Sequence, residues 1–295
     1  MRKSLILLVA AICMSLAACN KDNDTDSTST AKVHVSVNDF SISQEDFPGT
    51  KTGQDVADYN GVKVMVLAFY KADGTEQYKT TQLRSDSTTF TTFGEFDLSL
   101  PMGSYTMVVI GHGLNTGEPA ITLTSPTAAT FGTNPARETF VTTQAVNISS
   151  TNALDISATL NRVVSKLQVA SSDTRTAPAQ SVRMTFAAGG KSFNPTTGLA
   201  TDNTGFSNAV ITSTAVGVAS LSNSYLFLAT DEQTMDVTIE TLDEDGNVVF
   251  SKTVQNVPFK RNRVTKLTGA MYTNSGVSGG FLVETDWLDQ YEGTF

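Results

Sequence analysis

Apolar and polar residues alternate along many short segments of this chain. Valines at positions 33, 35 and 37 are separated by His34, Ser36 and Asn38, and the same alternation recurs from Met235 to Glu240. Successive side chains of a strand point to opposite faces, so a period of two predicts strands with one buried face. No segment keeps a helical period over three turns. The pattern predicts an all-β protein, with further strands at 62–70, 77–82, 94–100, 104–111, 154–160, 163–170, 181–187, 225–229, 248–254 and 264–272.

A strand, an Asp-Gly turn and a second strand occur in this order twice, at residues 67–81 and 239–253. Asp-Gly favours hairpins because glycine adopts the positive φ that a tight reversal requires. A repeat at this separation predicts two similar β-domains in tandem, and the chain is long enough for both. We place the N-terminal domain at 31–160 and the C-terminal domain at 161–295, with a tail at 274–295.

Residues 1–18 have the pattern of a bacterial lipoprotein signal peptide. A basic start precedes an apolar run from Leu5 to Leu16, and the run ends in Leu16-Ala17-Ala18-Cys19. An uncleaved membrane span is the alternative, but this run is shorter than the about 20 apolar residues that cross a bilayer. We therefore expect cleavage before Cys19, lipidation of its thiol, and a flexible polar tether at residues 19–30.

The charge of the chain argues against a nucleic-acid partner. The formal net charge is −9 and the isoelectric point is near 4.7, whereas phosphate binding needs clustered Lys and Arg. Residues 260–263, Lys-Arg-Asn-Arg, form the one locally basic segment, and we interpret them as a solvated face beside a strand. Abundant Thr, Ser and Val again favour strands over helices.

Only two histidines are present, so the usual general bases are scarce. His34 lies opposite the valines of its predicted strand, and His112 lies in a Gly-His-Gly turn. We assign no catalytic residue and expect that the protein is not an enzyme. Spaced His or Cys pairs that would predict a metal site are absent from the sequence, and we expect no cofactor.

Two acidic segments contain side chains that are also found in binding or catalytic sites. Residues 243–247 offer oxygen atoms that suit calcium, but they lack the rest of a twelve-residue calcium loop and so predict a hairpin turn. The tail contains three carboxylates, Asp286, Asp289 and Glu292, and a glycosidase site uses a pair of such groups. The sequence contains no second motif that would complete such a site. We interpret these tail acids as solvated.

Three segments together resemble the fimbrillin superfamily, which comprises the pilus subunits of type V (Bacteroidales) fimbriae and their lipoprotein relatives. The first is the lipoprotein motif at 16–19, and the second is the mid-chain segment 160–169. The third, residues 257–269, is similar to the family's proline, basic and Asn segment before the last strand, which ends in Gly. The similarity in layout covers nearly the whole chain.

The resemblance implies two transthyretin-like β-sandwiches and assembly by strand exchange. In this family a protease removes the first strand of the N-terminal domain, and the C-terminal segment of another subunit fills the groove; such pairing is β-augmentation. On this chain the first strand is Val33–Phe40. The candidate donor is the tail, where Phe281, Val283, Thr285 and Trp287 share one face of an extended segment.

The chain departs from the pattern of the family's stalk subunits, which are cleaved after an Arg between the first two strands. Residues 41–61 contain no Arg, and Lys51 is the candidate cleavage site. Cleavage at Arg84 would remove the strand at 62–70 as well. Either a Lys-tolerant protease acts at Lys51, or the chain stays untrimmed and lipid-anchored, in which case it would terminate or anchor a fibre.

We therefore predict a structural subunit of a surface pilus, or fimbrium, that contributes to cell adhesion. The lipid anchor would hold it in the outer membrane, and the tether after Cys19 resembles the surface-export signal of Bacteroidetes lipoproteins. The expected partners are other fimbrial subunits and a ligand on a host or bacterial surface. The alternative is a non-polymerising surface lipoprotein that binds glycan or protein ligands, with Trp287 as a sugar platform rather than a strand plug.

Overall fold

Strands account for all of the regular secondary structure in the computed structural model. It describes residues 29–41, 53–56, 59–86, 88–211, 214–273 and 282–284, and no helix occurs among them. The prediction of an all-β fold is confirmed. This part of the chain contains no long apolar helix of the kind that spans a membrane. The predicted signal peptide, Cys19, Lys51, Phe281, Thr285 and Trp287 lie outside the described residues.

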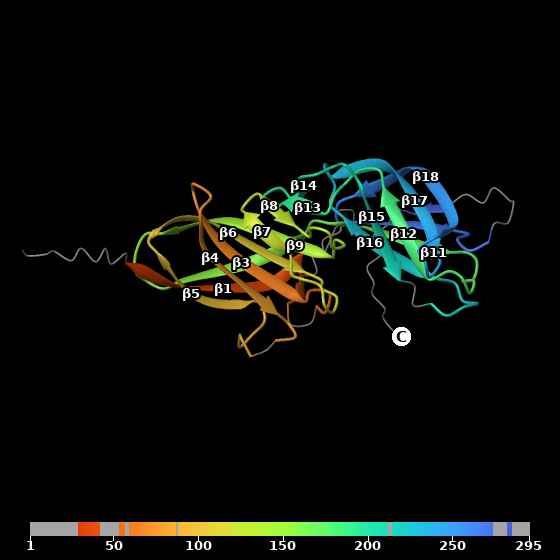
Figure 1. The fold of residues 1–295 in the computed structure, drawn as a ribbon. Coiled ribbons are helices and arrows are strands. Elements are labelled where there is room, and N and C mark those ends of the chain that lie inside the picture. Colours follow the sequence, from red (N-terminus) through yellow and green to blue (C-terminus); the bar gives the residue numbers. More distant parts are fainter. Residues whose placement is uncertain are drawn as a thin grey trace, which may run out of the picture.

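The N-terminal half, residues 29–162, is built on a curled sheet of eight strands (Figure 1). One layer is β5-β1-β10 and the other is β4-β3-β6-β9, and they join where Asn161 and Arg162 pair with Val141 and Phe140. The strands are β1 (Thr30–Ser41), β2 (Gly53–Asp55), β3 (Val64–Lys71), β4 (Glu76–Leu83), β5 (Glu95–Pro101), β6 (Gly103–His112), β9 (Thr139–Ile148) and β10 (Leu154–Arg162).

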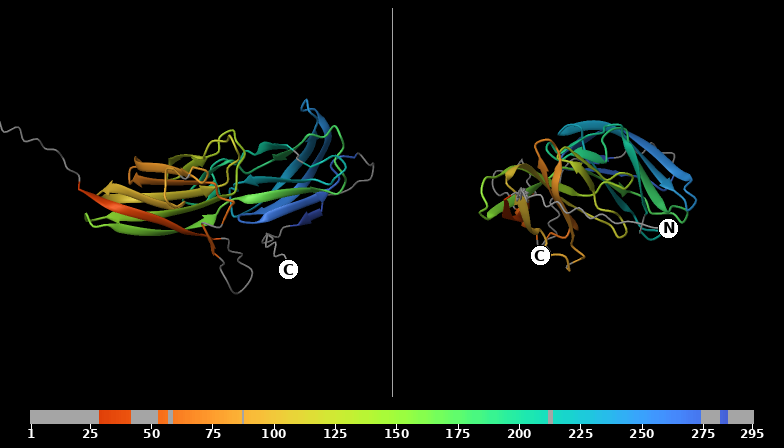
Figure 2. Two further views of the ribbon diagram at one scale, coloured as in Figure 1. Left: turned by 90° about the horizontal axis from the view of Figure 1, so that it is seen from below. Right: turned by 60° about the vertical axis from the view of Figure 1, so that its left-hand side comes forward.

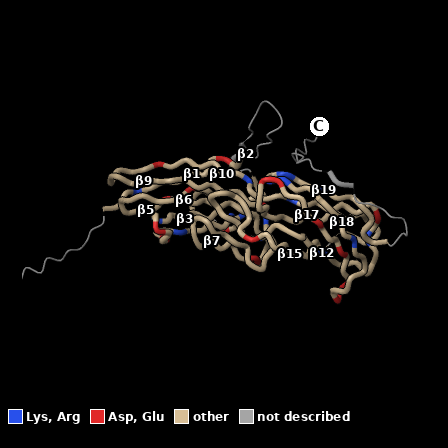
Figure 3. Tube along the Cα trace, turned by 90° about the horizontal axis from the view of Figure 1, so that it is seen from above, with Lys and Arg blue, Asp and Glu red and all other residues tan. Residues whose placement is uncertain are grey.

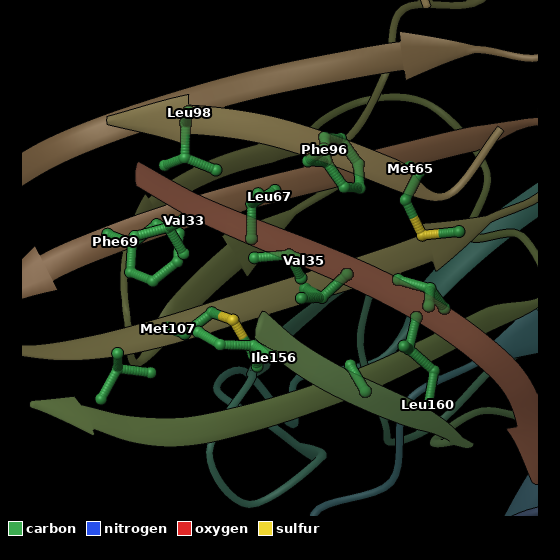
Figure 4. Close-up of a cluster of buried hydrophobic side chains, with 14 of the residues drawn as sticks. Val33, Val35, Met65, Leu67, Phe69, Phe96, Leu98, Met107, Ile156 and Leu160 are labelled. Carbon is green, nitrogen blue, oxygen red and sulfur yellow. The ribbon is translucent and has the colours of Figure 1, made fainter. Parts of the chain in front are cut away.

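The two layers enclose the core of this half (Figure 4). Val33 and Val35 of β1 face the other layer, because alternate side chains of a strand share a face. The buried residues around them are Met65, Leu67 and Phe69 of β3, Met107 of β6, Phe96 and Leu98 of β5, and Ile156 and Leu160 of β10.

β3 is buried on both faces, so its sequence is a continuous apolar run. Its second face, which carries Val64, Val66 and Tyr70, belongs to a second core shared by the two halves. Phe193 and Phe227 of the C-terminal half belong to this core, and their rings are stacked with centroids 4.3 Å apart. A small sheet crosses between the halves here and comprises β7 (Thr122–Ser125), β8 (Ala128–Thr130), β13 (Ser192–Asn194) and β14 (Leu199–Ala200).

The C-terminal half is a sandwich of two four-stranded sheets, and it lies end to end with the N-terminal half (Figures 1 and 2). One sheet has the order β16-β11-β19-β20, and the other has the order β15-β12-β17-β18. Their inner faces form a third core. The strands are β11 (Ser165–Ser171), β12 (Ser181–Phe186), β15 (Phe206–Ile211), β16 (Leu221–Leu226), β17 (Glu232–Leu242), β18 (Val248–Lys260), β19 (Val264–Gly269) and β20 (Leu282–Glu284).

The two halves have the same connectivity. In each, the first strand (β1 or β11) lies between an antiparallel neighbour (β5 or β16) and a parallel last strand (β10 or β19). The facing sheets correspond as β4-β3-β6-β9 and β15-β12-β17-β18. The two Asp-Gly hairpins noted in the sequence are β3–β4 and β17–β18. They do not correspond to each other, because the counterpart of β3–β4 in the C-terminal half is β12–β15. The two folds therefore repeat, although those hairpins are not the repeated element.

Candidate functional site

β1 lies inside its layer, with a partner strand on each edge. Residues 30–36 pair antiparallel with residues 95–101 of β5, and residues 33–41 pair in parallel with residues 154–161 of β10. β2 pairs with residues 39–41 at the end of the strand. Removal of β1 would therefore leave a groove one strand wide between β5 and β10.

The inward side chains of β1 are buried: Val33, Val35, Val37 and Phe40 are at most 3% exposed. Phe40 follows Val37 by three residues because the pairing with β10 shifts register between Val37 and Asp39, a bulge that returns Phe40 to the core. Its ring centroid lies 4.8 Å from that of Phe140. The sequence predicted this strand and its buried face correctly.

The buried face of β1 is large relative to the stability of a domain. Burial of one large apolar side chain contributes about 1.5–3 kcal/mol, so these four contribute about 6–12 kcal/mol together. A whole domain is stable by only about 5–15 kcal/mol. The N-terminal half therefore needs a strand in this groove, either its own or another of matching pattern.

The outward face of β1 carries a row of polar contacts to both neighbours. His34 Nδ1 lies 2.9 Å from Asp97 Oδ1, and His34 Nε2 lies 2.8 Å from Glu95 Oε2. Ser36 Oγ donates to Glu95 Oε1 at 2.6 Å, and Asn38 donates to Ser157 Oγ on β10. The Asp97 hydrogen bond raises the pKa of His34, and the charges of Asp97, Glu95 and Asp155 act in the same direction against desolvation.

His112 ends β6 rather than forming a turn, which corrects the sequence interpretation. Its side chain is buried against Phe131, where Nδ1 donates to Gly113 O at 2.6 Å and Nε2 accepts from Ile121 N–H at 3.1 Å. Burial lowers the pKa of His112 to about 4. The residue is a neutral core histidine at pH 7, with both ring nitrogens occupied.

Arg84 is part of the folded N-terminal half. Its guanidinium donates to Val62 O at 2.9 Å and to Val56 O at 2.7 Å, and it lies 4.1 Å from the centroid of the Phe93 ring. Proteolytic nicking concentrates at exposed, flexible loop tips, whereas these contacts hold the Arg84 side chain in the fold. Lys51, the candidate cleavage site, falls between β1 and β2 and outside the described residues.

The acidic segment 243–247 is the turn of the β17–β18 hairpin. Asp243 Oδ1 accepts from the backbone N–H of Asp245 at 3.0 Å and of Asn247 at 2.8 Å, and Gly246 has a φ of 81°. The Asn247 hydrogen bonds lower the pKa of the Asp243 carboxyl. The carboxylate thus stabilises the turn from within, as the hairpin interpretation requires.

The tail is described at β20 alone. Its backbone pairs antiparallel with β19, with Leu282, Val283 and Glu284 opposite Thr268, Leu267 and Lys266. Val283 is therefore the one candidate donor residue with a described backbone. β20 lies at the edge of its sheet, where it covers β19.

A buried ionic cluster that sequence reasoning missed joins the two halves. Arg162 Nη2 lies 2.8 Å from Glu138 Oε1, and Tyr59 OH donates to the same carboxylate oxygen at 2.6 Å. Arg162 Nη1 donates to Asn262 Oδ1 of the C-terminal half at 3.1 Å. The Asn161-Arg162 dipeptide within the family-like segment was the available signal, but its partners are distant in sequence.

A polar cleft of about 640 Å³ opens beside this cluster, and we call it the junction cleft. Its lining includes Thr142, Asn161, Asp231 and residues 260–263. Asn262 shapes the turn between β18 and β19 with a φ of 58°, and its N–H donates to Val164 O at 2.9 Å. The basic segment, interpreted from the sequence as a solvated face, thus lines a polar cleft between the halves, where the Lys260 side chain is 47% exposed.

Solved structures of low sequence identity are similar to this chain. A "putative adhesin" from Bacteroides ovatus has a TM-score of 0.52 and 11% identity, covering 89% of this chain and 97% of that one. The fimbrial anchor protein Mfa2 from Porphyromonas gingivalis has a TM-score of 0.49 and 12% identity, covering 88% and 98%. No curated protein sequence matches the chain.

The similarity to the adhesin extends over nearly all of both chains and shows a common fold. This common fold agrees with the resemblance to the fimbrillin superfamily that the sequence motifs indicated, and at 11% identity the similarity shows the fold alone. A family model described as "Family of unknown function (DUF6562)" matches residues 23–292, which is most of the sequence, and the chain therefore belongs to that family.

Proposed function

We propose that this protein is a structural subunit of a surface fimbria that assembles by strand exchange at β1 and contributes to adhesion. The observation that carries the proposal is the position of β1, which fills an inner position of its layer with a fully buried face. The common fold with an adhesin supports an adhesion role at the cell surface. In this proposal the two halves are transthyretin-like domains that meet near residue 160.

Lipidation of Cys19 would hold the newly exported chain on the outer membrane. Cleavage at Lys51 would then free β1, because its covalent link to the rest of the N-terminal half passes through residues 42–52. A Lys-specific protease should release the strand, whereas an Arg-specific one should not, since Arg84 is held by three groups of the fold. A chain that escapes cleavage would keep its anchor and end the fibre at the membrane.

The donor in this proposal is the tail, with Phe281, Val283, Thr285 and Trp287 entering the groove of the next subunit. A large aromatic dominates such an interface because it buries the most apolar area. The test uses two variants: a chain that ends after Gly280, and the full chain with Trp287→Ala, which keeps β20. Both should unfold at temperatures close to that of the wild type and should be absent from high-mass ladders on gels of surface fibres.

Normal incorporation of both variants into fibres would show that the tail is not a donor. Failure of the chain ending after Gly280 to fold, while Trp287→Ala folds and assembles, would make β20 an ordinary strand of the C-terminal sandwich. The pairing of β20 with β19 makes this control necessary.

A further inference from the structure

The junction cleft has an excess of positive charge in an acidic protein. Four cationic residues line it, against Asp231 and Glu232. Lys260 pairs with Glu232 at 3.0 Å, Arg261 pairs with Asp231 at 2.6 Å, and Arg162 pairs with Glu138. Figure 3 shows blue Lys and Arg positions together where the halves meet, beside the start of β19.

Arg263 differs from these three cations. It is half-buried in the cleft wall, and within the described part of the chain its guanidinium makes no hydrogen bond or ion pair. Its backbone is fixed, because Arg263 N–H donates to Lys260 O at 3.1 Å and Arg263 O accepts from Lys166 N–H at 3.0 Å. A guanidinium presents a planar fork of donors that suits carboxylates and stacks on aromatic rings.

β20 runs toward the end of β19 at which the junction cleft lies. Because β20 runs antiparallel to β19, with Glu284 opposite Lys266, the same register would place residue 287 opposite residue 263. These three further residues span about 10 Å in extended form. The residue at position 287 is the single tryptophan of the chain.

The tail also complements the cleft in charge. Residues 267–295 contain no Lys or Arg, and they contain four acidic residues, Glu284, Asp286, Asp289 and Glu292. Carboxylates of an extended segment can bind the guanidinium of Arg263, and the indole of Trp287 can stack on it.

We infer that the acidic segment 285–292 docks in the junction cleft of its own chain, with Trp287 against Arg263. The docking itself is independent of fibre assembly. If the tail is the donor strand, as the proposed function holds, the same contact keeps Trp287 out of the acceptor groove until another subunit competes for it.

The test is the fluorescence of Trp287 in the full, uncleaved chain, because no other tryptophan contributes. In the wild type, acrylamide should quench the indole weakly at low salt and more strongly at about 1 M NaCl, where charges are screened beyond about 3 Å. Arg263→Ala should lower the ratio of docked to undocked tail about 2–5-fold and raise quenching accordingly. Lys252→Ala is the matched control, since Lys252 is an exposed cation of β18 away from the cleft, and it should leave quenching unchanged.

A second variant, with Asp286→Asn, Asp289→Asn and Glu292→Gln together, removes the three acidic charges of segment 285–292 without touching the cleft and should loosen Trp287 in the same way. Equal quenching in the wild type and in both variants would overturn the inference. Quenching that falls as protein concentration rises would overturn it too, because the tail would then occupy the cleft of a second copy. Since every measurement uses the monomer, loss of fibre assembly in the truncated chain has no bearing on this result.

Discussion

The cluster of Arg162, Glu138 and Tyr59 at the junction allows a quantitative prediction. The Arg162 side chain is 3% exposed and that of Glu138 is 14% exposed, so the pair is shielded from water. Arg162→Met keeps most of the packing volume but leaves the Glu138 carboxylate with only the Tyr59 hydroxyl, at 2.6 Å, among the described side chains of the cluster. Removing one partner of a buried ion pair typically costs about 3–5 kcal/mol, because the other charge stays desolvated.

We therefore expect Arg162→Met to lower the free energy of unfolding by about 3–5 kcal/mol in urea titrations. Adding Glu138→Gln to this variant removes the unpaired charge and should restore most of the loss, since replacing both members of such a pair is often nearly neutral. A loss below about 1 kcal/mol for Arg162→Met, the range of an exposed ion pair, would refute the reasoning. So would a double variant that is less stable than the single one.

Three further predictions concern β1 and the anchor. Phe40→Ala should cost about 3–5 kcal/mol in urea titrations, whereas Phe90→Ala, at a partly exposed position, should cost below about 1 kcal/mol; similar losses would contradict the burial of β1. The pKa of His34 is raised on folding, so its contribution to stability should be complete below about pH 6.5 and lost as the pH rises through the folded-state pKa. Melting temperatures of the wild type and His34→Gln should converge at high pH, and a constant difference would exclude this pairing. Cys19→Ala should release the protein from the membrane fraction, and retention would exclude the lipid anchor.

The sequence allowed prediction of the strands that have one buried and one solvated face. The predicted strands with alternating burial include β1, β10, β11 and β17. A strand that packs on one face only has apolar and polar residues in alternation, and this period of two is visible in the sequence. β9 was missed, since residues 142–144 at its centre, Thr-Thr-Gln, are polar on both faces while its ends are buried. In the small sheet, β7 pairs with β8 and β13 pairs with β14 within one half each, and the β8–β13 pairing joins the two halves. Local pattern does not contain that last pairing.

The junction was less predictable than the strands. Asn262 and Arg162 are in hydrogen-bond contact across 100 positions of sequence. The charges of the Lys260–Arg263 segment are typical of a surface and predicted a solvated face, but the sequence did not indicate that the turn around Asn262 places this segment at the cleft between the halves. Cleavage, lipidation and strand donation depend on residues 19, 51 and 281–287, for which the sequence pattern remains the basis of prediction.

Locking β1 in its groove tests strand exchange most directly. Lys32 and Ser99 oppose each other in the β1–β5 pairing. Val37 N–H donates to Gly94 O at 3.0 Å, so these two residues form a hydrogen-bonded pair in the same register. Hydrogen-bonded and non-hydrogen-bonded pairs alternate along an antiparallel ladder, and Lys32 and Ser99, five residues further along, therefore form a non-hydrogen-bonded pair. The close Cβ atoms of such a pair suit a disulfide. Thr238 and Thr253, whose hydroxyl oxygens lie 2.8 Å apart on β17 and β18, provide the matched control.

The measurement is the amount of each variant in surface fibres before and after reduction. We predict that oxidised Lys32→Cys/Ser99→Cys stays out of the fibre as an acceptor, that reduction restores its incorporation, and that Thr238→Cys/Thr253→Cys assembles in either state. Incorporation of the oxidised β1 lock at the level of the control would contradict strand exchange at β1.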